Sequence, residues 1–374
     1  MVSSLTKIRA PDKQNLVPAN SMKPTLLLYG ANGYTGRLIS DLCKSYGLSP
    51  LLAGRNEAAL REMASNLNLP YRVVGLDQAE LLREVLQDIE VVIHAAGPFS
   101  HTALPMLEAC LATQTHYLDI TGEIAVFELA KTLATRAEKA GIMVMPGVGF
   151  DVVPTDCLAL YLKKKLPDAT HLKLAFINSG GGLSHGTAST MVEGLGQPGA
   201  IRENGVIVPR PVGHKSRWLT LNGKEYFVMT IPWGDVSTAY HTTGIPNIET
   251  YTGVQPRIQT FLKFQGLWNG LLRTKFVKRA IQKRVDKITG PGQEARAAGK
   301  SLIWGEVRNS AGETNTAMLE TPEGYTLTAH SSLIIAKKVL NGEFKNGYQT
   351  PGSGYGEDLI LEVPGTLRKD MFPA

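Results

Sequence analysis

Six apolar segments alternate with amphipathic ones between residues 25 and 146, and this alternation limits the fold more than any other feature of the chain. The apolar segments read TLLLYG, LSPLLAG, YRVVGL, EVVIHAAG, THYLDIT and IMVMPGV, and helical periodicity occupies 34–46, 56–67, 78–88, 101–113 and 124–140. Short strands that are apolar on both faces, each followed by a helix, indicate a parallel sheet covered on both sides. The pattern predicts an α/β domain of the doubly wound, Rossmann type.

The pattern changes after Thr155. A helix over 155–165 and a strand over 171–178 are followed by short β-like runs in 217–252 and 301–330. These predict a second α+β domain with a mostly antiparallel sheet. We expect a disordered tail or leader over 1–22, a dinucleotide-binding domain over 23–150 to which 346–374 return, and a substrate domain over 151–345.

Composition excludes several classes of protein. With 43% hydrophobic and 19% charged residues in 374, the chain is typical of a globular protein, and it has no run of 18 apolar residues that would span a membrane. Three widely separated cysteines predict buried thiols in a reducing compartment, so we expect a cytoplasmic protein. No cluster of histidine, cysteine or acidic residues has the spacing of a metal site.

Much of the positive charge lies in one segment. Residues 257–287 hold nine Lys or Arg and one acid, Asp286, so they carry +8 of a net charge of +6, and the rest of the chain is about −2. A nucleic acid partner is therefore not expected. Within 257–288, apolar residues such as Phe261, Phe264 and Trp268 recur at helical spacing. This basic amphipathic segment suits peripheral contact with an anionic membrane or an acidic acyl carrier protein. A helix pair that packs on the core with a solvated basic face is the alternative, and the assembly is left open between monomer and homodimer.

A glycine-rich turn follows the first predicted strand. The stretch YGANGYTGRLI places Gly30, Gly33 and Gly36 where a strand turns into a helix. Such a turn lets the backbone approach a pyrophosphate and points helix N–H groups at the anion. We expect the whole turn to bind a dinucleotide; it comprises Gly30, Ala31, Asn32, Gly33, Tyr34, Thr35 and Gly36.

The end of the second strand predicts which dinucleotide is bound. An NAD site usually has an acidic residue there for the ribose hydroxyls, whereas this chain has Gly54, Arg55 and Asn56. A guanidinium pairs well with a 2′-phosphate, so the predicted cofactor is NADP(H). A solvated Arg55 at a helix start is the alternative. Asp77, after the third strand, is predicted to accept from the adenine amine, or else to cap a helix.

Candidate groups for the chemistry follow the later strands. Ala95, Ala96, Gly97, Pro98 and Phe99 leave the fourth strand at the edge where ligands bind, and small residues there admit the nicotinamide ribose. We expect Gly149, after the sixth strand, to contact the cofactor as well.

The fifth and sixth strands supply the polar groups. Tyr117, Asp119 and Thr121 share one face of the fifth strand, and Glu123 and Asp151 follow at strand ends. Tyr117, Asp119, Glu123 and Asp151 are the candidate proton donors. The alternative is that Tyr117 fills the core and the two acids of the fifth strand cap the next helix. His94, inside an apolar strand, is interpreted as a core residue.

These motifs together resemble the saccharopine dehydrogenase-like oxidoreductases, in particular their short bacterial members and the trans-acting enoyl reductases. The resemblance covers residues from about 24 to the C-terminus and includes AAGPFSHTALPMLEAC, PGVGFDVVPTDCLA, GPGQEARAAGKSLIWGEV and TPGSGYGEDLILEVPG. Two positions depart from the family: Phe99 stands where tyrosine is frequent, and His94 where asparagine is frequent.

The resemblance implies an NADPH-dependent reductase acting on a small-molecule or carrier-bound substrate. We expect hydride transfer to an activated C=C bond. Reduction of a C=N bond, as in opine-type dehydrogenases of amino-acid-like substrates, is the alternative. A protein that senses NADP(H) without turnover is an alternative of another class, and Phe99 favours it because a hydroxyl is missing near the nicotinamide.

Overall fold

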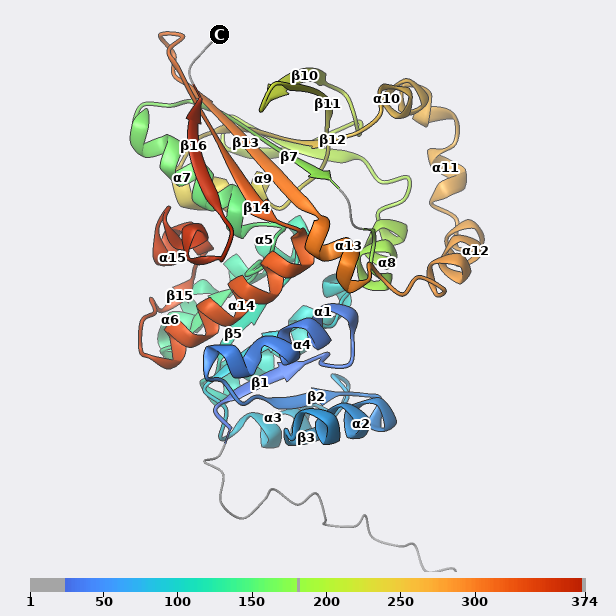
Figure 1. Cartoon of the computed structure of the whole chain (residues 1–374), viewed down its shortest axis with the longest axis vertical. Helices are drawn as coiled ribbons and strands as arrows, with labels where there is room; N and C mark the ends of the chain where they lie inside the picture. The colour runs from blue at the N-terminus through green and yellow to red at the C-terminus, as the bar shows by residue number, and fades with distance from the viewer. Residues whose placement is uncertain (1–23, 180–181, 372–374) are drawn as a thin grey trace, which may run out of the picture.

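A computed structural model describes residues 24–179 and 182–371, so the tail predicted over 1–22 lies outside the described residues. Two sheets build the molecule, with the first at the bottom of Figure 1 and the second at the top. The predicted fold class, a Rossmann-type parallel sheet with a second α+β domain, is confirmed.

The first sheet contains seven parallel strands in the order β15-β6-β5-β4-β1-β2-β3. They are β1 (Leu26–Tyr29), β2 (Leu51–Gly54), β3 (Tyr71–Val73), β4 (Val91–His94), β5 (His116–Asp119), β6 (Met143–Met145) and β15 (Gly347–Tyr348). The chain adds β2 and β3 on one side of β1 and then crosses over to add β4, β5 and β6 on the other side. The carboxyl ends of β1 and β4, where the order of addition switches, form the edge where such sheets bind ligands. Six of the strands match the six apolar segments, and β15 is a seventh from near the C-terminus.

Helices cover both faces of this sheet because alternate strand residues point to opposite sides. Leu26 and Leu28 pack in one cluster with α1 and α2, whereas Leu27 and Tyr29 pack in another with α3, α4, α5 and α6. The helices are α1 (Tyr34–Cys43), α2 (Glu57–Leu67), α3 (Ala79–Leu86), α4 (Phe99–Thr113), α5 (Ile124–Thr132) and α6 (Ala134–Ala140), with a 3₁₀ turn, η1 (Lys44–Tyr46), after α1. The helix expected over 124–140 is divided at Leu133.

The second sheet has nine strands, and only β12 and β7 run parallel to each other among its described pairs. Its main path is β10-β11-β12-β7-β13-β14-β16, with β8 and β9 attached beside β12. The strands are β7 (His171–Ser179), β8 (Gly199–Glu203), β9 (Val206–Arg210), β10 (Ser216–Leu221), β11 (Lys224–Thr230), β12 (Asn247–Gly253), β13 (Lys300–Arg308), β14 (Thr314–Pro322) and β16 (Leu367–Met371). The mostly antiparallel prediction therefore holds.

Two helices replace strands expected in this half. Residues 217–252 contain α9 (Asp235–Thr243), and the stretch after Pro322 begins α14 (Gly324–Leu340) instead of continuing the β-like run expected up to residue 330. The Glu323 carboxylate accepts the backbone N–H groups of Tyr325 and Thr326, which fixes the start of α14 despite its β-branched residues. On the second sheet, α9 packs beside α7 (Val153–Lys165).

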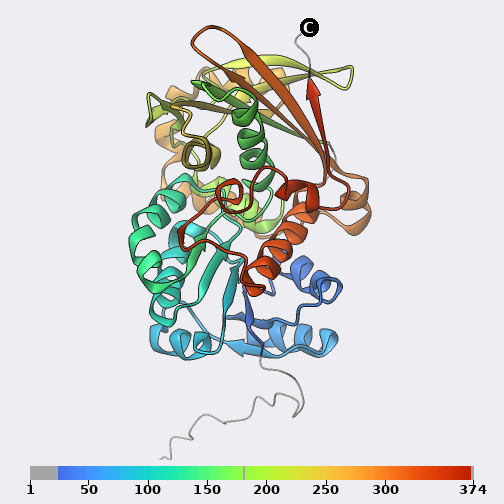
Figure 2. The ribbon, with the colours of Figure 1, turned by 90° about the vertical axis from the view of Figure 1, so that its left-hand side faces the viewer.

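Helix α14 lies between the two sheets (Figures 1 and 2). It packs against α1, β4 and β5 of the first sheet and against β14 of the second. The chain then forms β15 in the first sheet, α15 (Pro351–Tyr355), the 3₁₀ turn η3 (Leu359–Glu362) and finally β16 in the second sheet. Of the segment 346–374, which was expected to return to the first domain, β15 lies there and β16 does not.

Short helices project from the second sheet at the right of Figure 1. They are α10 (Pro256–Leu262), the 3₁₀ turn η2 (Gln265–Leu267), α11 (Asn269–Leu272) and α12 (Lys275–Val285), and α8 (His185–Glu193) and α13 (Gln293–Ala298) lie beside them. We call residues 256–285 the arm. No described helix is long and apolar enough to cross a bilayer. The three cysteines, Cys43, Cys110 and Cys157, are buried and free, as expected.

Candidate active site

A cavity of about 1480 Å³ opens at the carboxyl ends of β1, β2 and β4 and reaches the second domain. Its walls come from the glycine-rich turn, the ends of β2 and β4, the loops after β5 and β6, and α8 with the loop before α9. The predicted cofactor residues that line it are Gly30, Asn32, Gly33, Tyr34, Thr35, Gly54, Arg55, Asn56, Ala95, Ala96, Gly97 and Phe99. Among the described residues, no three histidine, cysteine or acidic side chains are grouped to hold a metal ion.

The glycine-rich turn has the geometry of a pyrophosphate cradle. Gly30 has a φ of +82°, and a Cβ atom there would lie 2.9 Å from Ala95 and Ala96. A Cβ on Gly36 would lie 2.3 Å from the Gly30 carbonyl oxygen, so Gly36 and the buried Ala31 serve close packing behind the cavity. Gly33 precedes α1 and offers no side chain to its N–H groups. These groups stay free for an anion, so the turn fits a bound dinucleotide.

Arg55 lies at the cavity edge beyond β2. Its side chain is exposed and forms no hydrogen bond or ion pair with any residue that the structure describes. Its neighbour Asn56 caps α2 by accepting the backbone N–H of Ala59 at 3.1 Å, which limits its role in ligand binding. Asp77 is exposed in a turn outside the lining of the cavity, and the residue at the N-cap of α3 is Gln78. The geometry therefore brings Arg55, and not Asp77, to the cavity.

The end of β4 forms the cavity floor. Ala95, Ala96, Gly97 and Phe99 line it, whereas Pro98, at the N-cap position of α4, does not. The Glu123 carboxylate accepts the backbone N–H of Phe99 at 2.8 Å and that of Ser100 at 2.9 Å. Glu123 thus caps α4, across 24 residues of sequence, and its negative charge is stabilised by the helix N-terminus.

Tyr117 and Asp119 lie inside the sheet and do not line the cavity. The Tyr117 hydroxyl donates to Asp119 Oδ2 at 2.7 Å, and Asp119 Oδ1 accepts the backbone N–H groups of Thr121 and Gly147, each at 2.9 Å. Burial raises the pKa of Asp119 to about 6, although these hydrogen bonds oppose the rise. This network ties the loop after β5 to the loop after β6, and the placement of the two side chains outside the cavity lining gives no support to their predicted role as proton donors.

His94 also belongs to this buried layer. Its Nδ1 lies 3.3 Å from the Tyr117 hydroxyl, and its ring packs edge-on against Tyr29 and Phe99. Burial lowers the pKa of His94 to about 3, so the imidazole is neutral at physiological pH. The interpretation of His94 as a core residue agrees with this placement.

Asp151 is the candidate acid that reaches the cavity without a fixed partner. It lines the cavity wall, and no described residue forms a hydrogen bond or ion pair with its carboxyl. Burial first, and then the nearby Glu123 carboxylate, raises the pKa of Asp151 from 3.8 to about 7. Gly122 supports this position, because a Cβ there would lie 2.5 Å from Asp151 Oδ2. Gly149 faces Thr328 of α14, where a Cβ on Gly149 would lie 2.8 Å from Thr328 Cγ2, and it is not part of the cavity lining.

The second domain supplies a wall that sequence reasoning did not predict in detail. Ile231, Pro232 and Trp233 line the cavity after β11, together with Met191 of α8 and Thr289 before α13. The only sequence signal was IPWG, a tryptophan between proline and glycine in a polar region. Ser184 to Thr187, at the start of α8, also line the cavity.

Tyr34 joins the glycine-rich turn to the second domain. Its hydroxyl donates to the Pro291 carbonyl at 2.7 Å and accepts from Arg296 Nη1 at 3.0 Å. Gly290, with a φ of +89°, lies against the ring so closely that a Cβ would be 2.5 Å from it. Tyr325 of α14 packs edge-on against the same ring. The two domains therefore meet directly over the dinucleotide turn.

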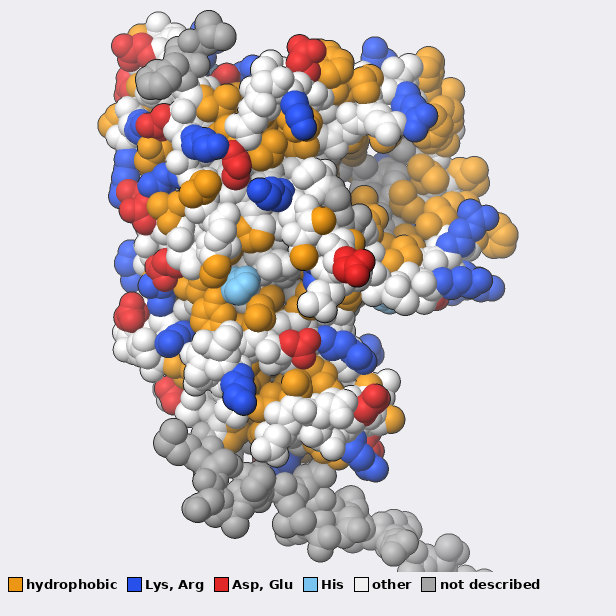
Figure 3. Space-filling model, viewed as in Figure 1, with side chains coloured by type: hydrophobic (Ala, Val, Ile, Leu, Met, Phe, Trp, Pro, Cys, Tyr) orange, Lys and Arg blue, Asp and Glu red, His pale blue; other side chains and the backbone are white. Residues whose placement is uncertain are grey.

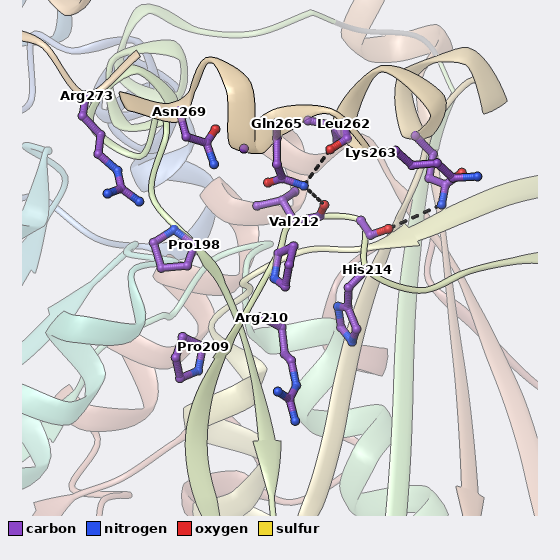
Figure 4. Close-up of a pocket in the computed structure, with 14 residues that line it drawn as sticks. Pro198, Pro209, Arg210, Val212, His214, Leu262, Lys263, Gln265, Asn269 and Arg273 are labelled. Atoms are coloured by element: carbon purple, nitrogen blue, oxygen red, sulfur yellow. Dashed lines mark hydrogen bonds between the residues drawn. The ribbon is translucent and has the colours of Figure 1, made fainter. Parts of the chain in front are cut away.

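A second cavity, of about 510 Å³, lies between the β8–β9 hairpin and the arm (Figure 4). The Gln265 side-chain amide donates to the carbonyl groups of Val212 and Leu262 there, at 2.9 and 2.8 Å. No described residue of its lining is acidic, and none also lines the first cavity. We therefore assign it no part in proton transfer.

Residues 26–145 match the saccharopine dehydrogenase NADP binding domain family. A saccharopine dehydrogenase-like oxidoreductase of mouse is 25% identical over 58% of this chain and 58% of its own length. Residues 26–145 thus carry the NADP-binding domain of the saccharopine dehydrogenase family, and the chain is similar to saccharopine dehydrogenase-like oxidoreductases. The cavity at the carboxyl ends of these strands is accordingly the candidate nicotinamide dinucleotide site of an oxidoreductase, and the glycine-rich turn and the ends of β2 and β4 line it.

Other members and neighbours of this family differ in how much they share with the chain. A lipid droplet localized protein of Caenorhabditis elegans is 25% identical over 75% of this chain and 77% of its own length. The trans-acting enoyl reductase of Mycobacterium leprae is 30% identical, but over 38% of this chain and 36% of its own length. Saccharopine dehydrogenase (L-Glu forming) of Saccharomyces cerevisiae has a similar fold, with a TM-score of 0.63 at 12% identity over 93% of this chain and 99% of that chain.

Proposed function

We propose that this oxidoreductase uses NADPH to reduce an activated C=C bond, of the enone or enoyl type, in an apolar substrate. The observation that carries the proposal is Asp151, a carboxyl without a fixed partner that lines the cavity, with the Glu123 carboxylate nearby. The same cavity is lined by apolar side chains, which are Phe99, Ile120, Ile124, Ile231 and Trp233 among others.

The preference for NADPH is inferred from Arg55. Its guanidinium is exposed at the cavity edge and has no ion pair among the described residues, so it is available to a 2′-phosphate. The acidic residues in the described lining are Glu123, Asp151 and Glu193, and none of them follows β2, where an NAD site usually has an acid for the ribose hydroxyls. A charged contact of this kind is worth roughly 1.5–3 kcal/mol, or about 10- to 150-fold in affinity.

When bound, the reduced nicotinamide supplies a hydride to the β-carbon of the substrate. The π electrons of the C=C bond then move toward the carbonyl oxygen, and the α-carbon requires a proton. Asp151 supplies that proton because its pKa of about 7 leaves about half of the carboxyl groups protonated at neutral pH. Glu123 holds the start of α4 and keeps the Asp151 pKa high. The apolar wall excludes water from the reacting carbons.

Reduction of a C=N bond in amino-acid-like substrates receives less support. Such substrates carry carboxylates that need cationic partners, and the Lys and Arg residues in the described lining are Arg37 and Arg55. Both flank the cofactor part of the cavity, and Arg37 Nε donates to the Asn32 carbonyl at 3.1 Å. A protein that only senses NADP(H) would not need a partner-free acid beside the nicotinamide, so Asp151 also disfavours that alternative.

The proposal is tested by following NADPH oxidation with three classes of substrate: medium-chain enones, enoyl thioesters, and keto acids supplied with amines. We expect turnover with an enone or enoyl thioester, and tighter binding of NADPH than of NADH. Turnover confined to the keto acid and amine pairs would replace the proposal with imine reduction. Cofactor binding without turnover of any class would favour the sensing alternative.

A further inference from the structure

The arm presents large apolar side chains to solvent. Exposed fractions are 82% for Phe276, 80% for Leu267 and 59% for Phe261. With Ile258, Phe264 and Leu271, which are exposed as well, they form what we call the arm face. In the helices of the arm only Val285 is buried. Scattered exposed apolar residues are ordinary, but six large ones within 19 residues mark an interaction surface.

Positive charge surrounds this face and is almost entirely unpaired. Of the nine Lys and Arg residues in 257–287, only Lys278 has an ion pair in the described part of the chain, with Glu193 at 3.9 Å. The one acid of the segment, Asp286, hydrogen-bonds to His185 and Gln282. Figure 3 shows Lys and Arg side chains beside hydrophobic ones on the arm, which projects at the right. The surface is therefore complementary to a partner that carries negative charge beside an apolar region.

The arm is attached to the body by contacts that leave this face free. Val285 packs with Ala188 and Val192 of α8. The Gln282 amide donates to Ser189 Oγ at 2.9 Å, and Arg273 Nε donates to the Gly196 carbonyl at 2.8 Å. The apolar residues of the arm face are thus not what holds the arm in place. The alternative in which the apolar side of the segment packs on the core therefore holds for Ile281, Val285 and Ile288, which pack with α8, and not for the arm face.

We propose that the arm face docks on an anionic lipid surface. Lipid headgroups supply the negative charge, and the acyl region accepts apolar side chains from several short helices without a matching shape. A second copy of the chain is a poor partner, because pairing two such faces would bring two segments of charge +8 together. An acidic protein would need a complementary surface for six side chains that project from separate helices.

The position of α8 connects the docking face to the cavity. On one side α8 packs against α12, and on the other it lines the cavity with Thr187, Thr190 and Met191. Met191 is 58% exposed, so an apolar side chain marks the cavity mouth beside the arm. This step rests on the proposed function: the apolar substrate is a lipid-borne compound that enters from the docked membrane.

Docking is tested by co-sedimentation of the full chain with phosphatidylcholine vesicles, with and without phosphatidylglycerol, over a series of salt concentrations. We expect binding to the anionic vesicles alone, and weaker binding as salt screens the charges. Lys275→Gln, Arg279→Gln, Lys283→Gln and Arg284→Gln in one variant should lower the partition coefficient on the order of several hundred-fold, at about fivefold per cation. A second variant, with Phe261→Ser, Leu267→Ser and Phe276→Ser, should also lose binding.

Matched controls remove exposed positive charges or exposed apolar side chains elsewhere. Lys44→Gln, Lys139→Gln, Lys224→Gln and Lys337→Gln remove four exposed lysines outside the arm, and Val206→Ser with Leu367→Ser removes apolar side chains that are 62% and 58% exposed. Both controls should bind like the parent. The proposal is overturned if the parent protein does not bind anionic vesicles at low salt. It is also overturned if the arm face mediates dimerisation, or binds an acidic carrier protein in place of vesicles. Thermal melting of each variant separates lost docking from lost folding.

Failure of docking and failure of the proposed function give different results. Vesicle binding requires no turnover, and none of the substituted residues lines the active-site cavity. If the function is right and docking is right, the arm variants reduce a water-soluble enone like the parent but lose activity toward an enone dissolved in vesicles. Parent-like activity of the arm variants toward the vesicle-borne enone would overturn delivery from the membrane. Vesicle binding without reduction of any enone would support the docking proposal and refute the proposed function.

Discussion

Replacing Asp151 with asparagine should change activity and stability in opposite directions. A carboxyl with its ordinary pKa of 3.8 is protonated at pH 7 in roughly one molecule in a thousand, whereas a pKa of about 7 leaves about half of them protonated. Asp151→Asn removes this proton donor, so kcat should fall about 10²- to 10⁴-fold. NADPH affinity should stay close to that of the parent, since the carboxyl is placed near the reacting carbons and not at the cofactor phosphates.

The effect on stability follows from the direction of the pKa shift. Below pH 3.8 the carboxyl is protonated in both folded and unfolded chains, and between pH 3.8 and about 7 only the folded chain holds the proton. The free energy of unfolding therefore decreases as pH rises through this window, by up to about 4 kcal/mol. Asp151→Asn removes the penalty, so the variant should melt at a higher temperature than the parent at pH 8 and at a similar temperature near pH 4.

The assay is steady-state NADPH oxidation with an accepted enone between pH 5 and pH 9, together with thermal melting in the same buffers. Parent kcat should decline about tenfold per pH unit above pH 7, and the decline should be absent in Asp151→Asn. Gly122→Ala serves as a second variant, because its Cβ would displace the carboxyl without removing it. Parent-like kcat in Asp151→Asn, or an unchanged pH profile, would refute the assignment of the proton donor.

Four further substitutions test the rest of the site. Arg55→Asp should abolish or reverse the preference for NADPH, measured by titration with both cofactors; equal affinities in the parent would contradict the inference. Gly36→Ala should weaken dinucleotide binding and lower the melting temperature, because its Cβ would lie 2.3 Å from the Gly30 carbonyl oxygen. Tyr117→Phe should cost about 1–3 kcal/mol in unfolding free energy and leave kcat near that of the parent. A 100-fold loss of kcat in Tyr117→Phe would instead make that phenol the donor. Glu123→Gln should move the break in the pH–rate profile below pH 7, since the Glu123 charge helps to raise the Asp151 pKa; an unchanged break would exclude that coupling.

The parallel sheet was predictable because its strands are buried on both faces and read as apolar runs. The same reasoning failed for α9 and the start of α14, whose threonines and tyrosines favour strands. The Glu323 side chain caps the start of α14 and stabilises the helix there. A count of β-favouring residues does not include this stabilisation.

The site was predictable in its cofactor half and less so in its chemistry. Gly30 and Arg55 follow their strands directly and Gly33 lies in the turn that Gly30 begins, so their places were fixed once the strands were found. Strand periodicity placed Tyr117 and Asp119 on one face of the strand, and their side chains do form a hydrogen bond. Periodicity does not reveal that both side chains are buried. The capping of α4 by Glu123 and the approach of Trp233 depend on tertiary packing between distant segments.

The placement of α14 between the sheets has a consequence for how the protein unfolds. One continuous apolar cluster contains Leu28 and Ile93 from the first sheet, Leu333 from α14, and Phe176 and Ile303 from the second sheet. Neither half encloses this cluster without the other, so the two lobes are not independent cooperative units. The chain should melt in a single calorimetric transition, and a fragment ending near residue 150 should expose the shared interior and aggregate. The boundary near residue 150, which separates the dinucleotide-binding part from the substrate part, would thus divide a single folding unit.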